Sequence, residues 1–328
     1  MVSVFYETLR DFWPPAPKYL PEQYPDLTGK YVAITGTSAG IGYQTSKLLL
    51  KQNATVIALN RNPTKTSESF DRLIKEVSED TKGQVEEIRS RLLAVTIDLG
   101  DLTTIKSVES QLKKLKISQL DYLIFNAGVM QPANGSKTAQ GYELQIGTNV
   151  LGHHLLSKFL HPYVLKAAST TFQPRVVWLT SSAHLAAPPN GGIDFDSFYN
   201  ADKASGFDVY GQSKTGNVYQ AQIYGQKHKQ DGIVSLAVHP GYLASDLQRT
   251  YSATGQWLMG FLLHPPVYGS YTELFATLHP GITVEQNGSY IGPWGNFRSL
   301  RDDIKEGLTN GTAQKFWDWA DQQVEPFN

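Results

Sequence analysis

Along the chain, short apolar runs alternate with amphipathic stretches once Gly29 is passed. The runs predict buried strands at Tyr31–Thr35, Ala54–Leu59, Leu92–Ile97, Tyr122–Phe125, Val176–Leu179, Ile233–Val238 and Ser289–Ile291. The stretches between them predict helices over Ile41–Gln52, Lys65–Glu79, Leu102–Leu115, Gly141–Ala168 and Phe207–Lys229. Strands that alternate with helices are typical of βαβ units. We therefore expect an α/β protein with a doubly wound parallel sheet of about seven strands and helices on both faces.

The chain divides into a short leader and one long domain. Phe5, Leu9 and Phe12 lie at helical spacing within residues 1–27, an aromatic and proline-rich extension. This predicts a short amphipathic helix that packs on its own domain, with peripheral contact to a membrane or partner as the alternative. Residues 28–328 contain no repeat or linker and are expected to form a single domain. The irregular stretches 183–206 and 242–266 both follow predicted strands, where an open parallel sheet binds its ligands, so we interpret them as substrate loops.

Composition removes several classes of function. Lys and Arg total 29 against 30 for Asp and Glu, a formal net charge of −1. This balance argues against a nucleic-acid partner, which requires a surplus of cations. The chain has no cysteine, which excludes disulfides, thiol catalysis, zinc–thiolate sites and iron–sulfur clusters. Neither a signal peptide nor a membrane span is visible, so a cytoplasmic location is expected.

A glycine-rich turn joins the first predicted strand to the first predicted helix. The turn reads Thr35-Gly36-Thr37-Ser38-Ala39-Gly40-Ile41-Gly42. Glycines at such a turn let a pyrophosphate approach the amides of the helix N-terminus, which predicts dinucleotide binding on a Rossmann-type fold. The same residues also fit GxSxG, an esterase elbow with Ser38 as nucleophile. Only one strand precedes the motif and Gly42 has no role in an elbow, so dinucleotide binding is favoured.

The end of the second predicted strand indicates which dinucleotide is bound. An acidic residue about 20 positions after the glycines would hold the ribose 2′-hydroxyl of NAD. This sequence has Asn60 and Arg61 there, with Lys65 as a weaker second cation. A guanidinium suits the 2′-phosphate, so Arg61 predicts NADP(H).

Two Tyr-x-x-x-Lys pairs are candidates for proton transfer, Tyr199 with Lys203 and Tyr210 with Lys214. Reduction of a carbonyl by hydride leaves an alkoxide that needs a proton, and a lysine one helical turn away lowers the pKa of a tyrosine that supplies it. Residues around Tyr199 favour turns, whereas Tyr210 opens a long stretch compatible with a helix. Tyr210 and Lys214 are therefore assigned.

Landmarks in a fixed order resemble the short-chain dehydrogenase/reductase family over about residues 28–294. They are the glycine turn, Asp98-Leu99, Asn126-Ala127-Gly128, Asn149, Ser181-Ser182, Tyr210-x-x-Ser213-Lys214 and Pro240-Gly241. The gap from Ser182 to Tyr210 is similar to the retinol-dehydrogenase-like branch, and the C-terminal region resembles fungal NADPH-dependent carbonyl reductases. The resemblance also implies homo-oligomers formed through the helices with Asn149 and Tyr210, with a monomer as the alternative because this branch includes monomers.

The resemblance implies a role for each landmark. Tyr210 would be the general acid, with Lys214 lowering its pKa and binding the nicotinamide ribose. Ser182 would orient the substrate carbonyl, with Ser181 as the alternative, and Asn149 would hold a water of the proton relay. The remaining cofactor contacts would come from Gly36, Thr37, Ser38, Gly40, Ile41, Gly42, Asn60, Asp98, Leu99, Asn126, Ala127, Gly128, Pro240 and Gly241. Ser245, where the family usually has threonine, would contact the carboxamide.

Substrate contacts are expected from His184 and from an apolar lid with Trp257 and Phe261. His154 and His161 share a helix face, but no carboxylate completes a metal-ligand set, so no metal is expected. The resulting prediction is NADPH-dependent reduction of a small apolar ketone or aldehyde. The alternatives are a non-catalytic NADP(H)-binding sensor and, more remotely, the Ser38 esterase.

Overall fold

One mostly parallel sheet organises the molecule in the computed structural model, which describes residues 4–198, 206–244 and 263–328. Within these residues eight strands pair in the order β3-β2-β1-β4-β5-β6-β7-β8. Their bounds are β1 Tyr31–Thr35, β2 Thr55–Asn60, β3 Leu92–Thr96, β4 Tyr122–Phe125, β5 Arg175–Leu179, β6 Val234–Val238, β7 Tyr290–Gly292 and β8 Asn296–Phe297. Only the β7–β8 pair is antiparallel. The predicted doubly wound sheet is confirmed, with the two-residue β8 added at its edge.

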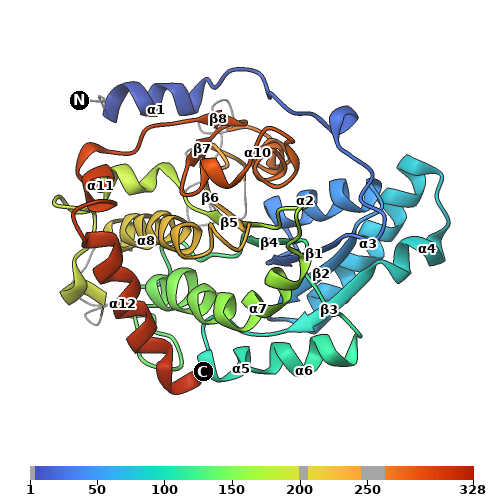
Figure 1. The fold of residues 1–328 in the computed structure, drawn as a ribbon, viewed down its shortest axis with the longest axis horizontal. Helices are drawn as coiled ribbons and strands as arrows, with labels where there is room; N and C mark the ends of the chain where they lie inside the picture. The colour runs from blue at the N-terminus through green and yellow to red at the C-terminus, as the bar shows by residue number, and fades with distance from the viewer. Residues whose placement is uncertain (1–3, 199–205, 245–262) are drawn as a thin grey trace.

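Helices cover both faces of this sheet (Figure 1). On one face lie α2 Gly40–Lys51, α3 Pro63–Thr81 and α10 Pro266–Leu278. On the other lie α5 Leu102–Ile105, α6 Ser107–Lys114, α7 His153–Ala167, α8 Gly206–Lys227 and α12 Thr312–Val324. The other α-helices within the described residues are α1 Val4–Phe12, α4 Val85–Ser90 and α11 Asp302–Gly307.

Each face of the sheet builds its own apolar core. In β1 the side chains of Val32 and Ile34 join the core under α2 and α10, whereas Ala33 joins the core under α7 and α8. Successive residues of a strand point to opposite faces, and here both faces are covered. This explains why the strands read as continuous apolar runs rather than as alternating patterns.

The helix predicted over Gly141–Ala168 differs most from the structure. A π-helical segment, Ile146–Gly152, precedes α7. Gly152 ends this segment where a Cβ atom would lie 2.5 Å from the carbonyl oxygen of Leu99, so the close packing requires glycine. The widened turn has no signature in the spacing of apolar residues, which is why the sequence did not predict it. Likewise, α4 and α10 were not predicted.

The terminal helices pack on the domain rather than extend from it. The predicted N-terminal helix is α1, and its Glu7 and Asp11 side chains are buried. In α12, Trp317 is buried with its ring 4.5 Å from that of His154, so this helix packs on α7. Among the described residues, no helix is both long and apolar enough to cross a membrane.

A buried carboxyl group joins α10 to α2. Glu273 is fully buried and one of its carboxyl oxygens accepts a hydrogen bond of 2.5 Å from the Thr45 hydroxyl. Burial raises the pKa of Glu273 from 4.5 to about 8. The unfolded chain therefore loses this proton near pH 4.5 while the folded chain keeps it up to about pH 8. Between these values the stability of the fold decreases as the pH rises.

Replacing Glu273 with glutamine tests this pH dependence. Glu273→Gln keeps the side-chain shape but carries no ionisable proton, so its melting temperature relative to the wild type should rise between pH 5 and pH 9, by on the order of 3 °C or more. Thermal unfolding at several pH values measures the difference, with exposed Glu79→Gln as the control. A difference that stays constant with pH would contradict the raised pKa.

Candidate active site

The residues predicted to bind cofactor and substrate gather at one edge of the sheet. Gly36 follows β1, Arg61 follows β2 and Asn126 follows β4. The serine pair and Pro240-Gly241 come just after β5 and β6. Because these strands are parallel, their carboxyl ends meet at this edge. Topology alone brings together residues separated by more than 200 positions in the sequence.

The glycine turn is held in a tight conformation. Gly36 has a φ of +75°, and a Cβ atom on Gly42 would lie 2.3 Å from the Gly36 carbonyl oxygen. The Asn126 amide donates hydrogen bonds to the carbonyl oxygens of Thr35 and Gly36, at 2.8 and 3.0 Å. The Ala127 amide donates to the Thr35 hydroxyl at 2.9 Å. Asn126 and Ala127 thus fix the turn itself, a contact that the sequence interpretation did not include.

This turn leaves the N-terminus of α2 open. Its N-cap residue is Ala39, which supplies no side-chain cap, and a Cβ atom on Gly40 would meet nothing within 4 Å. Uncapped amides and the helix dipole suit a phosphate group. Among the described residues, no histidine or carboxylate bonds the Ser38 hydroxyl, so the partners of an esterase nucleophile are not assembled there.

Asn60 and Arg61 have different positions at the end of β2. The Asn60 side chain is buried, where it accepts from the Thr37 amide at 2.8 Å and donates to the Thr37 hydroxyl at 2.9 Å. Arg61 is 76% exposed, and its guanidinium lies 3.9 Å from the Asp98 carboxylate. Asp98 also accepts from the Gly100 amide, while Leu99 is buried. Asn60 therefore shapes the glycine turn, and Arg61 is the residue available to a ligand.

Arg72 is a second cation near the glycine turn that the sequence interpretation missed. From α3 it donates to the Ser38 carbonyl oxygen at 3.1 Å, and its guanidinium lies 5.4 Å from the centre of the Tyr43 ring. Seven residues separate it from Lys65, so both lie on one face of the helix. The spacing of seven positions from Lys65 is the sequence signal by which Arg72 could have been found.

Tyr210 and Lys214 lie one turn apart near the start of α8, both buried. The Lys214 ammonium donates to the Leu179 carbonyl oxygen at 2.8 Å and lies 5.5 Å from the centre of the Tyr210 ring. A Cβ atom on Gly128 would lie 3.6 Å from this ammonium, so the cation is also close to the loop after β4. The alternative pair, Tyr199 and Lys203, lies outside the described residues.

Burial dominates the electrostatics of this pair. It raises the pKa of Tyr210 to about 12, against a lowering by a hydrogen bond with Ser181. Burial also lowers the pKa of Lys214 to about 7. The low tyrosine pKa expected from the sequence is thus not seen in the protein alone, because desolvation penalises both charged forms. At neutral pH the phenol holds its proton, as a proton donor must.

Asn149 lies in the π-helical segment and connects two parts of the site. Its amide oxygen accepts from the Val129 amide at 2.8 Å, and its amide nitrogen donates to the Ser213 hydroxyl at 3.1 Å. Its backbone carbonyl accepts from the Asn217 side chain at 2.9 Å. The loop after β4 and helix α8 are therefore held at a fixed separation.

The two serines after β5 have different tyrosine partners. Ser181 bonds the Tyr210 side chain, the bond that lowers the pKa of Tyr210. Ser182 instead donates its hydroxyl to the Tyr242 hydroxyl at 3.1 Å. The family resemblance names Ser182 as the residue at the carbonyl, whereas in this arrangement Ser181 is the serine bonded to Tyr210.

The loop after these serines is fixed by the C-terminal part of the chain. Arg301 donates to the carbonyl oxygens of Leu185, Ala187 and Pro188, at distances from 2.6 to 2.9 Å. His184, predicted to touch substrate, is buried with its Nδ1 atom 2.7 Å from the Ser181 carbonyl oxygen. Burial lowers the pKa of His184 to about 4, so its ring is neutral at physiological pH.

The last predicted contacts follow β6. Gly241 has a φ of +92°, and a Cβ atom there would meet the Pro293 ring at 3.3 Å, so Pro240-Gly241 makes a tight turn against the loop after β7. Ser245 and the lid residues Trp257 and Phe261 lie outside the described residues.

The helical histidines have protein partners. His153 lies 3.0 Å from the Thr35 hydroxyl, and His154 lies 3.0 Å from Asp321. His161 meets two residues that the sequence did not connect with it, His228 and Asp231, with donor atoms within 4.8 Å of one another. His161 and Tyr224 form a hydrogen bond of 2.9 Å, as do His228 and Asp231. The structure thus brings a carboxylate to these histidines that the sequence interpretation did not find.

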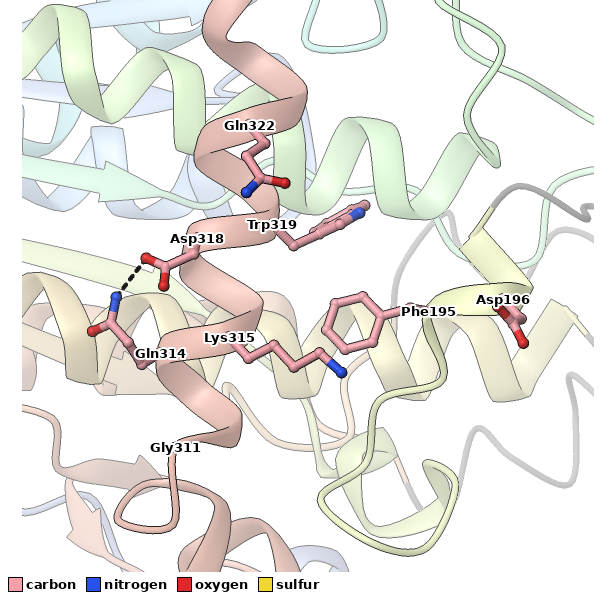
Figure 2. Close-up of a pocket in the computed structure, with 8 residues that line it drawn as sticks. All are labelled: Phe195, Asp196, Gly311, Gln314, Lys315, Asp318, Trp319 and Gln322. Carbon is pink, nitrogen blue, oxygen red and sulfur yellow. Dashed lines mark hydrogen bonds between the residues drawn. The ribbon is translucent and has the colours of Figure 1, made fainter.

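A surface groove of about 670 Å³ lies between α12 and the turn Phe195–Phe198, away from these residues (Figure 2). In it the Lys315 ammonium lies 4.9 Å from the centre of the Phe195 ring. None of the individually predicted site residues lines the groove, although Phe195 and Asp196 belong to the stretch 183–206 that the sequence interpretation made a substrate loop. The lining consists of Phe195, Asp196, Gly311, Gln314, Lys315, Asp318, Trp319 and Gln322.

Comparisons with known proteins agree with this geometry. The family profile described as short chain dehydrogenase matches residues 30–256. A short-chain dehydrogenase/reductase of Phomopsis amygdali is 36% identical over 98% of this chain and 98% of its own, and one of Neocamarosporium betae is 35% identical over 96% and 92%. The structure of Pseudomonas aeruginosa RhlG with NADP has the same fold, with a TM-score of 0.62 and 20% identity over 83% of this chain and 97% of its own. The chain therefore belongs to the short-chain dehydrogenase/reductase family of NAD(P)-dependent oxidoreductases.

Proposed function

We propose that this protein reduces a ketone or aldehyde to the alcohol with NADPH, and that Tyr210 supplies the proton. The observation that carries the proposal is the buried Tyr210–Lys214 pair at the carboxyl edge of the sheet, with the serine pair and Asn149 beside it. A protein that only binds the cofactor has no need to bury a lysine beside a tyrosine, since desolvating an ammonium is costly.

The described residues fit a dinucleotide. The open N-terminus of α2 and the narrow Gly36–Gly42 turn would receive the pyrophosphate, because any side chain on Gly42 would collide with the Gly36 carbonyl. Arg61 would hold the 2′-phosphate of NADPH, with Lys65 and Arg72 as further cations nearby. Asp98, Leu99 and Gly128 would line the adenine and nicotinamide ends. When bound, NADPH supplies the hydride.

Each chain residue then has a defined task. The Tyr210 phenol, protonated at neutral pH, donates its proton to the oxygen of the reduced carbonyl. The Lys214 ammonium, held by the Leu179 carbonyl, stabilises the phenolate that remains. Asn149 fixes the separation between helix α8 and the loop that contains Gly128. Ser182 orients the substrate carbonyl, and the Ser181 hydroxyl stabilises the phenolate form of Tyr210.

The substrate proposed is a small apolar carbonyl compound. The buried neutral ring of His184, which packs edge-on against Tyr290 with 5.0 Å between ring centres, would border it. The apolar residues Trp257 and Phe261 are proposed to cover it.

Tyr210→Phe tests the proton donor. Loss of the hydroxyl should lower turnover by at least about 10²-fold while NADPH still binds, because the phenyl ring fills the same space. NADPH oxidation, followed by absorbance against a panel of ketones and aldehydes, measures turnover, and fluorescence titration measures cofactor affinity. Turnover close to the wild-type value would remove Tyr210 from the reaction. Cofactor binding by a wild type that turns over nothing in either direction would favour the sensor alternative.

Arg61→Asp tests the choice of cofactor. The new carboxylate would stand beside Asp98 and repel a 2′-phosphate, so affinity for NADPH should fall at least about tenfold while affinity for NADH changes little. The matched control is Lys75→Asp, the same change of charge at an exposed position of α3. An unchanged ratio of the two affinities would show that Arg61 does not read the phosphate.

Alanine at each serine separates their roles. Ser182→Ala should lower kcat/KM by about 10²-fold through loss of a hydrogen bond to the reacting oxygen, and Ser181→Ala should lower it less. The comparison uses steady-state rates with one substrate and saturating NADPH. The reverse order would transfer the carbonyl-orienting role to Ser181.

A further inference from the structure

A second tyrosine stands beside the predicted catalytic serine. Tyr242 follows the Pro240-Gly241 turn, and its hydroxyl accepts the 3.1 Å hydrogen bond from Ser182. A serine hydroxyl rotates freely unless a partner holds it. Without a substrate, the single proton of Ser182 therefore points at Tyr242, and the bond fixes the position of the Ser182 oxygen at the edge of the site.

The N-terminal helix holds the ring of Tyr242. Phe12, at the end of α1, stacks on it with 4.4 Å between ring centres and an angle of 16° between their planes. The Phe12 carbonyl oxygen also lies 3.3 Å from Nε2 of His264. Aromatic stacking favours this position of the Tyr242 ring, in which its hydroxyl lies within hydrogen-bond distance of Ser182.

Buried polar contacts hold α1 against the loops after β6 and β8. The Asp11 carboxylate lies 3.3 Å from Nε2 of His239, the residue before Pro240, and Glu7 lies 3.2 Å from the Arg298 guanidinium, which follows β8. All four side chains are at most 10% exposed. A buried charge is costly unless it is paired, so the Glu7–Arg298 ion pair favours this position of α1. This helix precedes the region that the family profile covers, residues 30–256.

We propose that Tyr242 is a positioning residue for the Ser182 hydroxyl, and that α1 fixes Tyr242 in this role through Phe12. The proposal rests on the proposed function: when a carbonyl compound binds, the two hydroxyls exchange roles, so that Tyr242 donates to the Ser182 oxygen and Ser182 donates its proton to the substrate carbonyl. A segment that precedes the residues matched by the family profile thereby tunes the rate of the reaction.

A double-mutant cycle tests the link between the two hydroxyls. Tyr242→Phe removes the hydroxyl and keeps the stacked ring, so kcat should fall about tenfold while NADPH affinity stays within about twofold of the wild type. In the Ser182→Ala background the same substitution should change kcat by less than about twofold, because the group that it positions is gone. The proposal would be overturned if the kcat of the double variant fell by the product of the two single losses. It would also be overturned if Tyr242→Phe kept the wild-type kcat.

The contribution of α1 is measured with three substitutions. Phe12→Ala should lower kcat, as Tyr242→Phe does. Phe12→Tyr keeps an aromatic ring stacked on Tyr242 and should leave kcat close to the wild-type value. Leu9→Ala, on an exposed position of the same helix, should leave kcat unchanged. Equal losses in Phe12→Ala and Leu9→Ala would mean that α1 acts only on stability.

Urea unfolding of the wild type, the two single variants and the double variant tests the Ser182–Tyr242 bond without measuring turnover. If Ser182 and Tyr242 are bonded, the unfolding midpoint of the double variant should equal that of the less stable single variant, and additive midpoint shifts would contradict the contact. A wild type that turns over no carbonyl compound contradicts the proposed function, whereas this stability cycle decides on the Ser182–Tyr242 bond separately.

Discussion

The arrangement of the site depends on one contact, the hydrogen bond from a buried lysine ammonium to a backbone carbonyl. Lys214 is 3% exposed and donates to the carbonyl of Leu179, the last residue of β5. An unpaired charge in such a place is strongly unfavourable, so the end of β5 and the start of α8 must keep a fixed separation. The hydrogen bond from the Thr180 hydroxyl to the Lys214 carbonyl, 2.6 Å long, holds the same two elements together.

The surrounding structure is arranged to hold this contact rigidly. On one side, Asn149 connects α8 to the loop after β4 through its amide. On the other side, Arg301 holds the loop after the serines through three carbonyl oxygens, and α1 packs on the loops after β6 and β8 through buried polar contacts. The carboxyl edge of the sheet is thus bounded by loops whose anchors lie in distant parts of the chain. Such preorganisation is what proton transfer in a low-dielectric site requires.

The sequence predicts the parts of the molecule that depend on local patterns. The bounds of β1 and β4 are those expected, because strands buried on both faces read as unbroken apolar runs. The Tyr210–Lys214 pair falls on a helix, as its spacing required. Contacts that depend on tertiary packing were out of reach: Arg72 at Ser38, Phe12 on Tyr242 and Arg301 at Leu185 join residues at least 34 positions apart. The tyrosine pKa was misjudged for the same reason, since burial is a property of the fold and not of the motif.

The C-terminal helix covers part of the surfaces of α7 and α8. Helix α12 packs along α7 and α8 (Figure 1), where Trp317 covers His154 and Asp321 meets both His154 and Lys158, the latter at 2.8 Å. The faces of α7 and α8 beneath α12 are therefore interior surfaces of the domain. A ligand or partner could reach them only after α12 had been displaced and the buried ring of Trp317 returned to water.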